Sequence, residues 1–293
     1  MNNHVITGIG EALWDVLPEG KKLGGAPANF AYHVSQFGLE SCVVSAVGAD
    51  ALGEEIVANF AEKGLNRLIE TVSYPTGTVQ VEIDAAGIPQ YEIKEDVAWD
   101  NIPWTPALEQ LAARTKAVCF GSLAQRSAVS RATINRFLDT MPREADSLVV
   151  FDINLRQAFY TPEILEASMR RCNVLKINDE ELVIVARMFG CGDKTAEEVC
   201  RLLLSRYDLK MLILTCGTNG SYVFTPACCS FRETPVVEVA DTVGAGDSFT
   251  AAFISSLLKG KSVEEAHRTA VAVSAFVCTQ QGAMPVLPEA YTK

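Results

Sequence analysis

The strongest chemical pattern in the sequence is a glycine-rich turn bounded by two acids, Asp241-Thr-Val-Gly-Ala-Gly-Asp247. If a helix begins in this turn, three backbone amides converge at its N-terminus, those of Gly244, Ala245 and Gly246. Free amides and the helix dipole together favour an anion there. Asp247 would lie beside this anion site, where a carboxylate can take the proton from an attacking hydroxyl. The alternative is a first-turn acid that only complements the helix dipole, worth ~0.3–1 kcal/mol.

A second glycine pattern, Gly24-Gly25-Ala-Pro-Ala-Asn29, opens a predicted helix over Asn29–Phe37. Two glycines allow the backbone to approach a ligand closely, and the Asn29 side chain carries a donor and an acceptor for a polyol's hydroxyls. Asn29 could equally cap the helix. Asp15 follows the first predicted strand in a loop, the usual place for ligand contacts in open α/β sheets. A solvated loop acid is the alternative for Asp15.

A third group of polar residues follows two apolar segments. Arg156 is the best local cation for a phosphate or an anionic transition state. Asn178 ends a predicted strand and Glu181 lies three residues later in the next helix, so both could face one site. A lone carboxylate suits Mg²⁺, which binds largely through water and substrate phosphates. An exposed helix acid is the alternative interpretation of Glu181.

Alternating apolar strands and helices surround these residues. The predicted strands are His4–Gly10, Ser41–Val47, Val118–Ser122, Val149–Arg156, Val174–Asn178 and Met211–Thr215, with a short extended segment at Val236–Val239. The further predicted helices are Leu52–Lys63, Glu180–Met188, Ser248–Lys259 and Ala266–Thr279. This order predicts an α/β fold with a mostly parallel sheet covered on both faces.

Ligands bind along the carboxyl edge of such sheets. That edge would gather the following residues: Asp15, Arg156, Asn178, Thr215, Gly217, Gly220 and Asp247. A set of unrelated capping residues is the alternative, but it does not predict that they share one edge.

The segment Thr76–Val97 has a different pattern, in which apolar and polar residues alternate on both sides of a turn at Ala85–Pro89. Alternation of this kind predicts a half-buried hairpin outside the parallel sheet. We expect one domain over residues 1–293, with a small β lid formed by about residues 11–25 and 71–100 that excludes water when it closes. An exposed lid could also pair with a second subunit to give a homodimer.

The overall composition excludes several classes of function. A net charge of −11 argues against nucleic acid or an anionic membrane as a partner. The nine cysteines include no Cys-x-x-Cys pair and there are only three histidines, so we expect neither a zinc site nor disulfides, but free thiols in a cytoplasmic protein. Leu13 stands where a dinucleotide fingerprint requires its third glycine. Gly260-Lys-Ser262 ends a helix, so it is not a Walker A motif.

Five motifs, in this order, resemble the ribokinase-like (PfkB) carbohydrate kinases over nearly the whole chain. They are Gly24-Gly25 with Asn29, Asp152-x-Asn154-x-Arg156, Asn178-x-x-Glu181, Thr215-x-Gly217 and Asp241-Thr-x-Gly-Ala-Gly-Asp247. The resemblance implies transfer of the ATP γ-phosphoryl group to a primary sugar hydroxyl, with Asp247 as the base and the amides of Gly244, Ala245 and Gly246 as the anion hole.

The resemblance also implies roles for the remaining residues. The sugar-side residues would be Asp15, Gly24, Gly25, Asn29 and Arg156. The nucleotide-side residues would be Asn178, Thr215, Gly217, Gly220 and Val271, with Glu181 near Mg²⁺. Family members often hold a monovalent cation such as K⁺ near the residue that matches Asp241.

Within the family, three segments look most like fructokinases, namely Gly10–Asp15, Gly121–Arg126 and Asp152–Arg156. We therefore expect fructose as the substrate. Ribose, 2-keto-3-deoxygluconate or a nucleoside would use the same catalytic residues. A phosphosugar would need cations over its distal phosphate, for which Lys94 and Arg126 are the evident residues. A sugar-sensing regulator without catalysis is the alternative from a different class.

Overall fold

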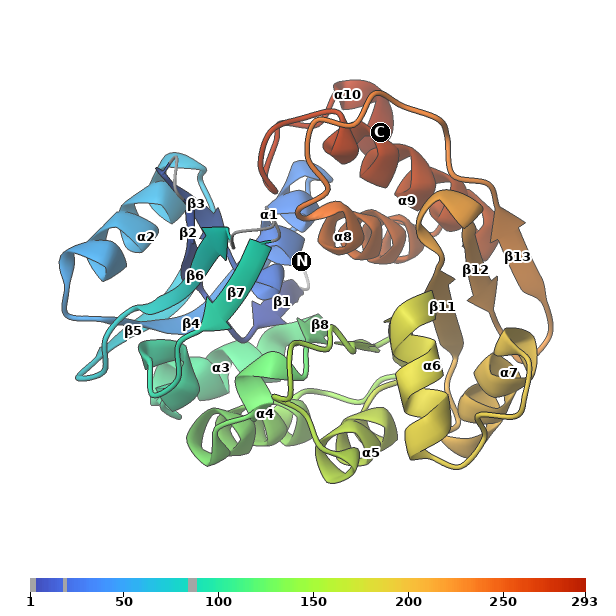
Figure 1. The fold of residues 1–293 in the computed structure, drawn as a ribbon, viewed down its shortest axis with the longest axis horizontal. Helices are drawn as coiled ribbons and strands as arrows, with labels where there is room; N and C mark the ends of the chain where they lie inside the picture. The colour runs from blue at the N-terminus through green and yellow to red at the C-terminus, as the bar shows by residue number, and fades with distance from the viewer. Residues whose placement is uncertain (1–3, 18–19, 84–88) are drawn as a thin grey trace.

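The computed structural model describes residues 4–17, 20–83 and 89–293. A nine-stranded sheet forms its centre, in the order β13-β12-β11-β10-β9-β8-β1-β4-β5 (Figure 1). Its strands are β1 (Val5–Ile9), β4 (Ser41–Gly48), β5 (Arg67–Val72), β8 (Thr115–Phe120), β9 (Leu148–Asp152), β10 (Val174–Asn178), β11 (Met211–Thr215), β12 (Ser221–Phe224) and β13 (Cys229–Arg232). Every pair from β5 to β11 is parallel, and β12 and β13 extend one edge in antiparallel pairs.

Helices cover both faces of this sheet because successive side chains of its strands point to opposite faces and both faces are apolar. Phe120 and Phe151 contribute to one hydrophobic core, and their chain neighbours Cys119 and Val150 contribute to the other. The first core is covered by α3 (Pro106–Arg114), α4 (Ala128–Thr140), α5 (Pro162–Arg171), α6 (Asp179–Met188) and α7 (Ala196–Arg206). The second is covered by α1 (Ala26–Gln36), α8 (Ala245–Leu258) and α9 (Val263–Cys278). The predicted doubly covered parallel sheet is confirmed.

The remaining helices are short or peripheral. Helix α2 (Ala51–Glu62) packs through Ile56 and Phe60 into a third core with α1 and β4, and α10 (Glu289–Thr292) lies near the C-terminus. Across the described ranges, no helix combines the length and the apolar character needed to cross a membrane.

A second, four-stranded sheet is built from two insertions into the main fold. Its strands are β2 (Leu13–Leu17), β3 (Gly20–Gly24), β6 (Gly77–Ile83) and β7 (Pro89–Ile93), in the order β3-β2-β6-β7. The antiparallel β6–β7 pair confirms the predicted hairpin, whereas most of its predicted turn lies outside the described residues. The first insertion adds β2 and β3, so the hairpin is half of a larger sheet. Its predicted action as a lid stays a prediction.

Two local predictions are wrong. Asp15 does not lie in a loop, because β2 pairs with β3 on one side and with β6 on the other, which places Asp15 within a strand opposite Lys22 and Val79. The segment Val236–Val239 forms neither strand nor helix. The side chains of Val236 and Val239 are exposed, so they do not pack on a neighbouring strand or helix.

A buried ion pair holds the base of the small sheet against the main fold. Arg126 donates through Nε and Nη2 to the two carboxylate oxygens of Asp100, each at 2.8 Å. Its guanidinium also lies 4.1 Å from the ring centre of Trp99 and 4.5 Å from that of Phe159. The same Arg126 donates to the carbonyl of Lys94, which directly follows β7. Arg126 therefore links the end of the small sheet to the loop after β8.

Replacing Asp100 by Ala should destabilise the protein by about 3–5 kcal/mol, because it leaves the Arg126 charge buried without a partner. Urea unfolding followed by circular dichroism measures this free energy. The matched control is Glu197→Ala, which breaks the exposed pair with Arg201 and should change stability by less than about 0.5 kcal/mol. Equal effects of the two substitutions would show that the buried pair does not hold the small sheet in place.

Candidate active site

A buried ion pair lies at the carboxyl edge of the main sheet. The parallel register between β9 and β10 places Asp152 beside Lys176, whose Nζ lies 3.1 and 2.9 Å from the two carboxylate oxygens. Both side chains are less than a tenth exposed. Thr250, on α8, directs its hydroxyl toward the same carboxylate at 3.5 Å. The sheet and α8 therefore meet over this charged pair.

The first turn of α8 approaches the pair closely because it is made of small residues. Gly244 precedes the helix with a left-handed φ of 78°, and a Cβ on it would lie 2.6 Å from the Ala283 side chain. A Cβ on Gly246 would lie 3.2 Å from Nζ of Lys176. The Ala245 amide donates to the Thr242 carbonyl at 3.3 Å, while amides in the first turn of a helix have no acceptor within the helix. The α8 N-terminus can therefore receive an anion.

Asp247 lies in this first turn and is held by a residue from a different helix. Asn29 donates from Nδ2 to Oδ2 of Asp247 at 2.7 Å. Burial and the nearby Asp152 charge raise the pKa of Asp247 to about 6, against the lowering effect of the Asn29 hydrogen bond and the charges of Lys176 and Arg156. Asn29 lies inside α1, which begins after Gly25, so the helix-cap interpretation of Asn29 is wrong. Its Oδ1 is buried and has no hydrogen-bond partner among the described residues.

Glu11, just beyond the end of β1, is a further acid at this edge that the sequence analysis did not select. It lines a small cavity together with Asp152, Asp247 and Thr250. Only 4% of Glu11 is exposed, and its Oε2 is buried with no partner in the described part of the chain. Burial and the Asp247 charge raise its pKa to about 7, although backbone hydrogen bonds and Arg156 oppose the shift.

Gly24 and Gly25, before α1, have no side chains and so allow α1, Glu11 and the small sheet to approach one another closely. Gly25 has a φ of 126°, and a Cβ on it would lie 2.5 Å from the carbonyl oxygen of Glu11. A Cβ on Gly24 would lie 2.6 Å from Oδ2 of Asp15. Burial raises the pKa of Asp15, while the charge of Arg156 lowers it. Arg156 is exposed and donates from Nη1 to the Leu155 carbonyl at 3.0 Å, and its positive charge lowers the pKa values of Asp15, Glu11 and Asp247.

Asn178 and Glu181 form a reciprocal cap at the start of α6. Asn178 accepts from the Glu181 amide at 2.8 Å, and Oε2 of Glu181 accepts from the Asn178 amide at 3.0 Å. Oε1 of Glu181 accepts from the Leu155 amide at 2.8 Å, and only 6% of Glu181 is exposed. The exposed-acid alternative for Glu181 is therefore wrong. The β10–β11 register places Asn178 beside Thr215.

Some predicted residues lie at the margin of this cluster. Gly217 and Gly220 shape the loop between β11 and β12 with φ values of 52° and 98°. Val271 lies on α9, and one turn later Ser274 donates to the Ala245 carbonyl at 2.9 Å. Asp241 lies before α8 and accepts hydrogen bonds from the Val243 and Gly282 amides.

The sequence contained a signal for the two residues that the analysis missed. Lys176 interrupts the otherwise apolar strand Val174–Ile177, and Glu11 is separated from the buried β1 only by Gly10. A charged side chain is rarely buried unless it is paired, so its presence in such a strand predicts a partner on a neighbouring strand.

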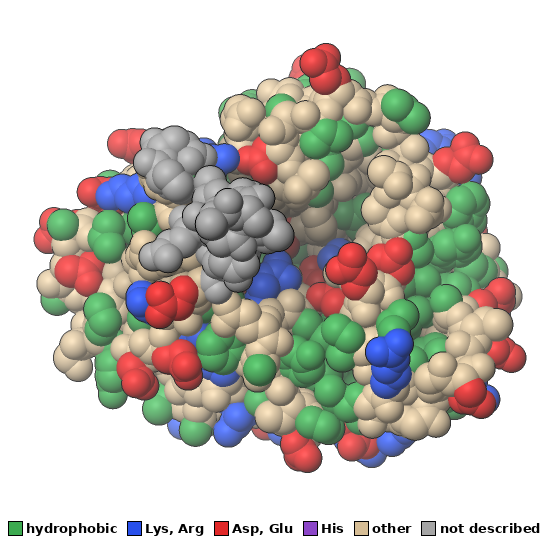
Figure 2. All heavy atoms as spheres, in the orientation of Figure 1, with side chains coloured by type: hydrophobic (Ala, Val, Ile, Leu, Met, Phe, Trp, Pro, Cys, Tyr) green, Lys and Arg blue, Asp and Glu red, His purple; other side chains and the backbone are tan. Residues whose placement is uncertain are grey.

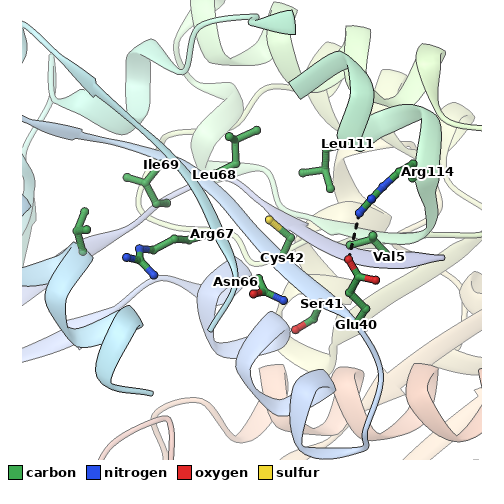
Figure 3. A pocket seen from close by; sticks show the side chains of 11 residues that line it. Val5, Glu40, Ser41, Cys42, Asn66, Arg67, Leu68, Ile69, Leu111 and Arg114 are labelled. Atoms are coloured by element: carbon green, nitrogen blue, oxygen red, sulfur yellow. Dashed lines mark hydrogen bonds and ion pairs between the residues drawn. The ribbon is translucent and has the colours of Figure 1, made fainter. Parts of the chain in front are cut away.

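Two hollows lie at opposite edges of the main sheet. Figure 2 shows one in the middle of the displayed face, with acidic and basic side chains in its depth. The other, of about 610 Å³, lies at the amino ends of β1, β4 and β5, where Arg114 and Glu40 form an ion pair (Figure 3). The charged cluster described above occupies the carboxyl edge, where ligands bind in folds of this class.

The fold is of the doubly covered α/β class with a charged cluster at the carboxyl edge of its sheet, and comparisons with known proteins identify its family. A family model described as pfkB family carbohydrate kinase matches residues 18–290, so the chain belongs to this family of phosphotransferases that act on a sugar hydroxyl. A fructokinase from Salmonella typhimurium is 29% identical over 300 residues, which cover 96% of this chain and 95% of that protein. An ATP-dependent 6-phosphofructokinase from Thermoanaerobacterium thermosaccharolyticum is 29% identical over 275 residues, 92% of this chain and 83% of that protein.

Solved structures confirm the fold. A fructokinase from Xylella fastidiosa with bound ATP superposes with a TM-score of 0.85 at 22% identity, covering 98% of this chain and 96% of that one. A double mutant of the Vibrio cholerae fructokinase, in its fructose, ADP and potassium ion bound form, superposes with a TM-score of 0.82 at 23% identity, covering 99% and 97%.

The buried Glu11 predicts a pH-dependent gain of stability in the Glu11→Gln variant. The folded protein holds the Glu11 proton more tightly than the unfolded chain, so wild-type stability falls as pH rises from 4.5 through about 7. At pH 8 the variant should exceed the wild type by an amount on the order of 3 kcal/mol, and at pH 4.5 by almost nothing. Urea unfolding at both pH values measures the difference. A Glu11→Gln effect equal at both pH values would contradict the prediction.

Proposed function

We propose that this protein transfers the γ-phosphoryl group of ATP to a primary hydroxyl of fructose, with Asp247 as the general base. The observation that carries the proposal is the Asp247 carboxylate, held by Asn29 at 2.7 Å in the first turn of α8. In the reaction the sugar oxygen bonds to the γ-phosphorus, the bond from that phosphorus to the ADP oxygen breaks, and the hydroxyl proton passes to Asp247.

The electrostatics of the first turn of α8 support this role. A base with a pKa of about 6 is largely ionised at pH 7 and is still basic enough to accept a proton in the transition state. The amides of Gly244, Ala245 and Gly246 are proposed as the anion hole for the transferring group at the N-terminus of α8, where the Ala245 amide would exchange its 3.3 Å bond to the Thr242 carbonyl for the anion. Lys176 adds a buried positive charge next to Gly246.

We assign the sugar to the space between the small sheet and α1. The proposed contacts are Asp15, Gly24, Gly25, Asn29 and Arg156. Carboxylate and amide groups suit the hydroxyls of a neutral polyol because they accept and donate hydrogen bonds. The orphaned Oδ1 of Asn29 supports the assignment, since a buried polar atom without a partner is suited to a ligand hydroxyl.

We assign the nucleotide to the far side of α8. The proposed contacts are Asn178, Thr215, Gly217, Gly220 and Val271, and Glu181 is proposed to act near Mg²⁺. In the described ranges no group of three or more Asp, Glu, His or Cys side chains could hold a metal ion. The proposal for Glu181 rests on its single buried carboxylate, because Mg²⁺ is usually held by one or two carboxylates, water and substrate phosphates. Bound Mg²⁺ would supply positive charge to the phosphates.

The cations around the site favour a neutral sugar over a phosphosugar. Arg126 is already committed to Asp100, and Lys94 pairs with Glu92 on β7 at 2.7 Å. Arg126 is thus engaged in a buried pair, whereas the exposed Lys94–Glu92 pair could open to a phosphate at little cost. The 6-phosphofructokinase among the relatives makes fructose 6-phosphate the second candidate substrate.

A panel of acceptors tests the proposed substrate. With ATP and Mg²⁺, we expect turnover of fructose and weak or no turnover of fructose 6-phosphate, fructose 1-phosphate, ribose, 2-keto-3-deoxygluconate and adenosine in a coupled ADP-release assay. Asp247→Asn should lower kcat on fructose by ~10²–10⁴-fold and leave the circular dichroism spectrum unchanged. Turnover of another acceptor would overturn the substrate assignment. Sugar binding without turnover of any acceptor would favour a regulator.

The pH dependence of kcat tests the partnership of Asn29 and Asp247. The wild-type rate should fall as pH drops through about 6, because protonated Asp247 cannot accept the sugar proton. Asn29→Leu removes a hydrogen bond that lowers the pKa of Asp247, so this acid limb should move to higher pH. The control Ser35→Ala removes a hydroxyl bonded to the Tyr32 carbonyl on the same helix and should leave the limb unchanged. If the acid limb of the Asn29→Leu profile stayed at the wild-type pH, the Asn29 hydrogen bond would not set the pKa of Asp247.

The homodimer remains a prediction. The strands β3 and β7 form the two edges of the small sheet, and size-exclusion chromatography with light scattering measures whether a second copy pairs there.

A further inference from the structure

A lysine of the small sheet forms an ion pair with the acid that begins the glycine-rich turn. Lys22 lies on β3, and its Nζ is 3.2 Å from Oδ2 of Asp241, 219 residues later in the chain. The β2–β3 register places Lys22 opposite Asp15, so this cation lies between the small sheet and the turn before α8. It is the one direct ion pair across this boundary among the described residues.

The Asp241 carboxylate is a nearly buried anion whose other contacts come from the backbone. Oδ1 accepts from the Val243 amide at 3.1 Å, and Oδ2 accepts from the Gly282 amide at 3.2 Å. The Asp241 side chain is 12% exposed. Burial acts to raise its pKa, but the two amides and Lys22 outweigh it, so the pKa lies below the usual value and the group is ionised at neutral pH. The negative charge of the Asp241 carboxylate is thus paired with the positive charge of the Lys22 ammonium.

The carbonyl oxygens beside Asp241 are also engaged. The Cys278 carbonyl accepts from the Ala240 amide at 2.8 Å and from the Asp241 amide at 3.3 Å. The Ala240 carbonyl accepts from Nε2 of Gln281 at 3.4 Å. A monovalent metal ion is held by carboxylate and carbonyl oxygens, so it would have to compete with the Lys22 ammonium and with these donors.

We propose that Lys22 supplies in cis the positive charge that a monovalent cation would otherwise bring to Asp241, so that this protein works without K⁺. An ammonium and K⁺ carry the same charge, and either one neutralises the carboxylate at the entrance to α8. The residues around Asp241 therefore do not fit a required K⁺ site while Lys22 is in place. Because the cation belongs to β3, it also ties the small sheet to the turn that carries Asp247.

The experiment compares the wild type with Lys22→Met in potassium chloride and in tetramethylammonium chloride at equal ionic strength. We expect the wild type to have the same rate and the same Tm in both salts. Lys22→Met should lose about ten-fold in kcat in tetramethylammonium and regain it with saturable dependence on K⁺. Its Tm should rise by about 2–4 °C in K⁺ relative to tetramethylammonium, because the ion binds only the folded state.

Two further variants separate the charge of Lys22 from other effects. Lys21→Met is the matched control, since the adjacent Lys21 pairs with Glu55 and should give no K⁺ response. The double variant Lys22→Met with Asp241→Asn removes the carboxylate and should lose the K⁺ response of the single variant. Saturable activation of the wild type by K⁺ would overturn the proposal, as would a Lys22→Met variant without any K⁺ response in Tm. The Tm comparison needs no turnover, so it stands even if the proposed kinase activity fails.

Discussion

The charged cluster at the carboxyl edge of the main sheet depends on one buried ammonium, that of Lys176. Burial alone would lower the pKa of this lysine, but Asp152, Glu181 and Asp247 raise it, so it stays charged among three carboxyl groups. A parallel sheet makes this possible because the register between β9 and β10 fixes Lys176 beside Asp152. Without that charge the acids at the carboxyl edge would repel one another, and α8 could not approach with its N-terminus and with Asp247.

The surroundings of Asp247, Glu11 and Asp241 give these three acids different pKa values. Asp247 accepts a hydrogen bond from Asn29 and has a pKa of about 6, whereas Glu11 has an unpaired oxygen and a pKa of about 7. Asp241 is held by two amides and Lys22, and its pKa lies below the usual value. The carboxyl group is the same in each case, so the differences come from burial, charge and the number of donors.

The small sheet completes the site from two separate insertions. The β2–β3 insertion brings Asp15 and Lys22, and the β6–β7 insertion is anchored at its base by the Arg126–Asp100 pair. Charged contacts therefore add to the apolar packing of Leu13, Val79 and Ile93 that joins this sheet to the main fold. Each such contact is sensitive to the loss of one partner, because a desolvated charge that loses its partner is strongly unfavourable.

The sequence by itself determined the alternation of helices and buried strands, the doubly covered parallel sheet, the β6–β7 hairpin and the glycine turn with Asp247, since these depend on hydrophobic periodicity and on local turn chemistry. Apart from that hairpin, only the tertiary structure decided which strands became neighbours. The β2–β3 pairing moved Asp15 from a predicted loop into a strand, and the β9–β10 register revealed Lys176 beside Asp152. Neither these pairings nor the contacts of Asn29 with Asp247 and of Lys22 with Asp241 have a local signature. They join segments distant in sequence, and their energy comes from charges and polar groups that lose water only when the chain is folded.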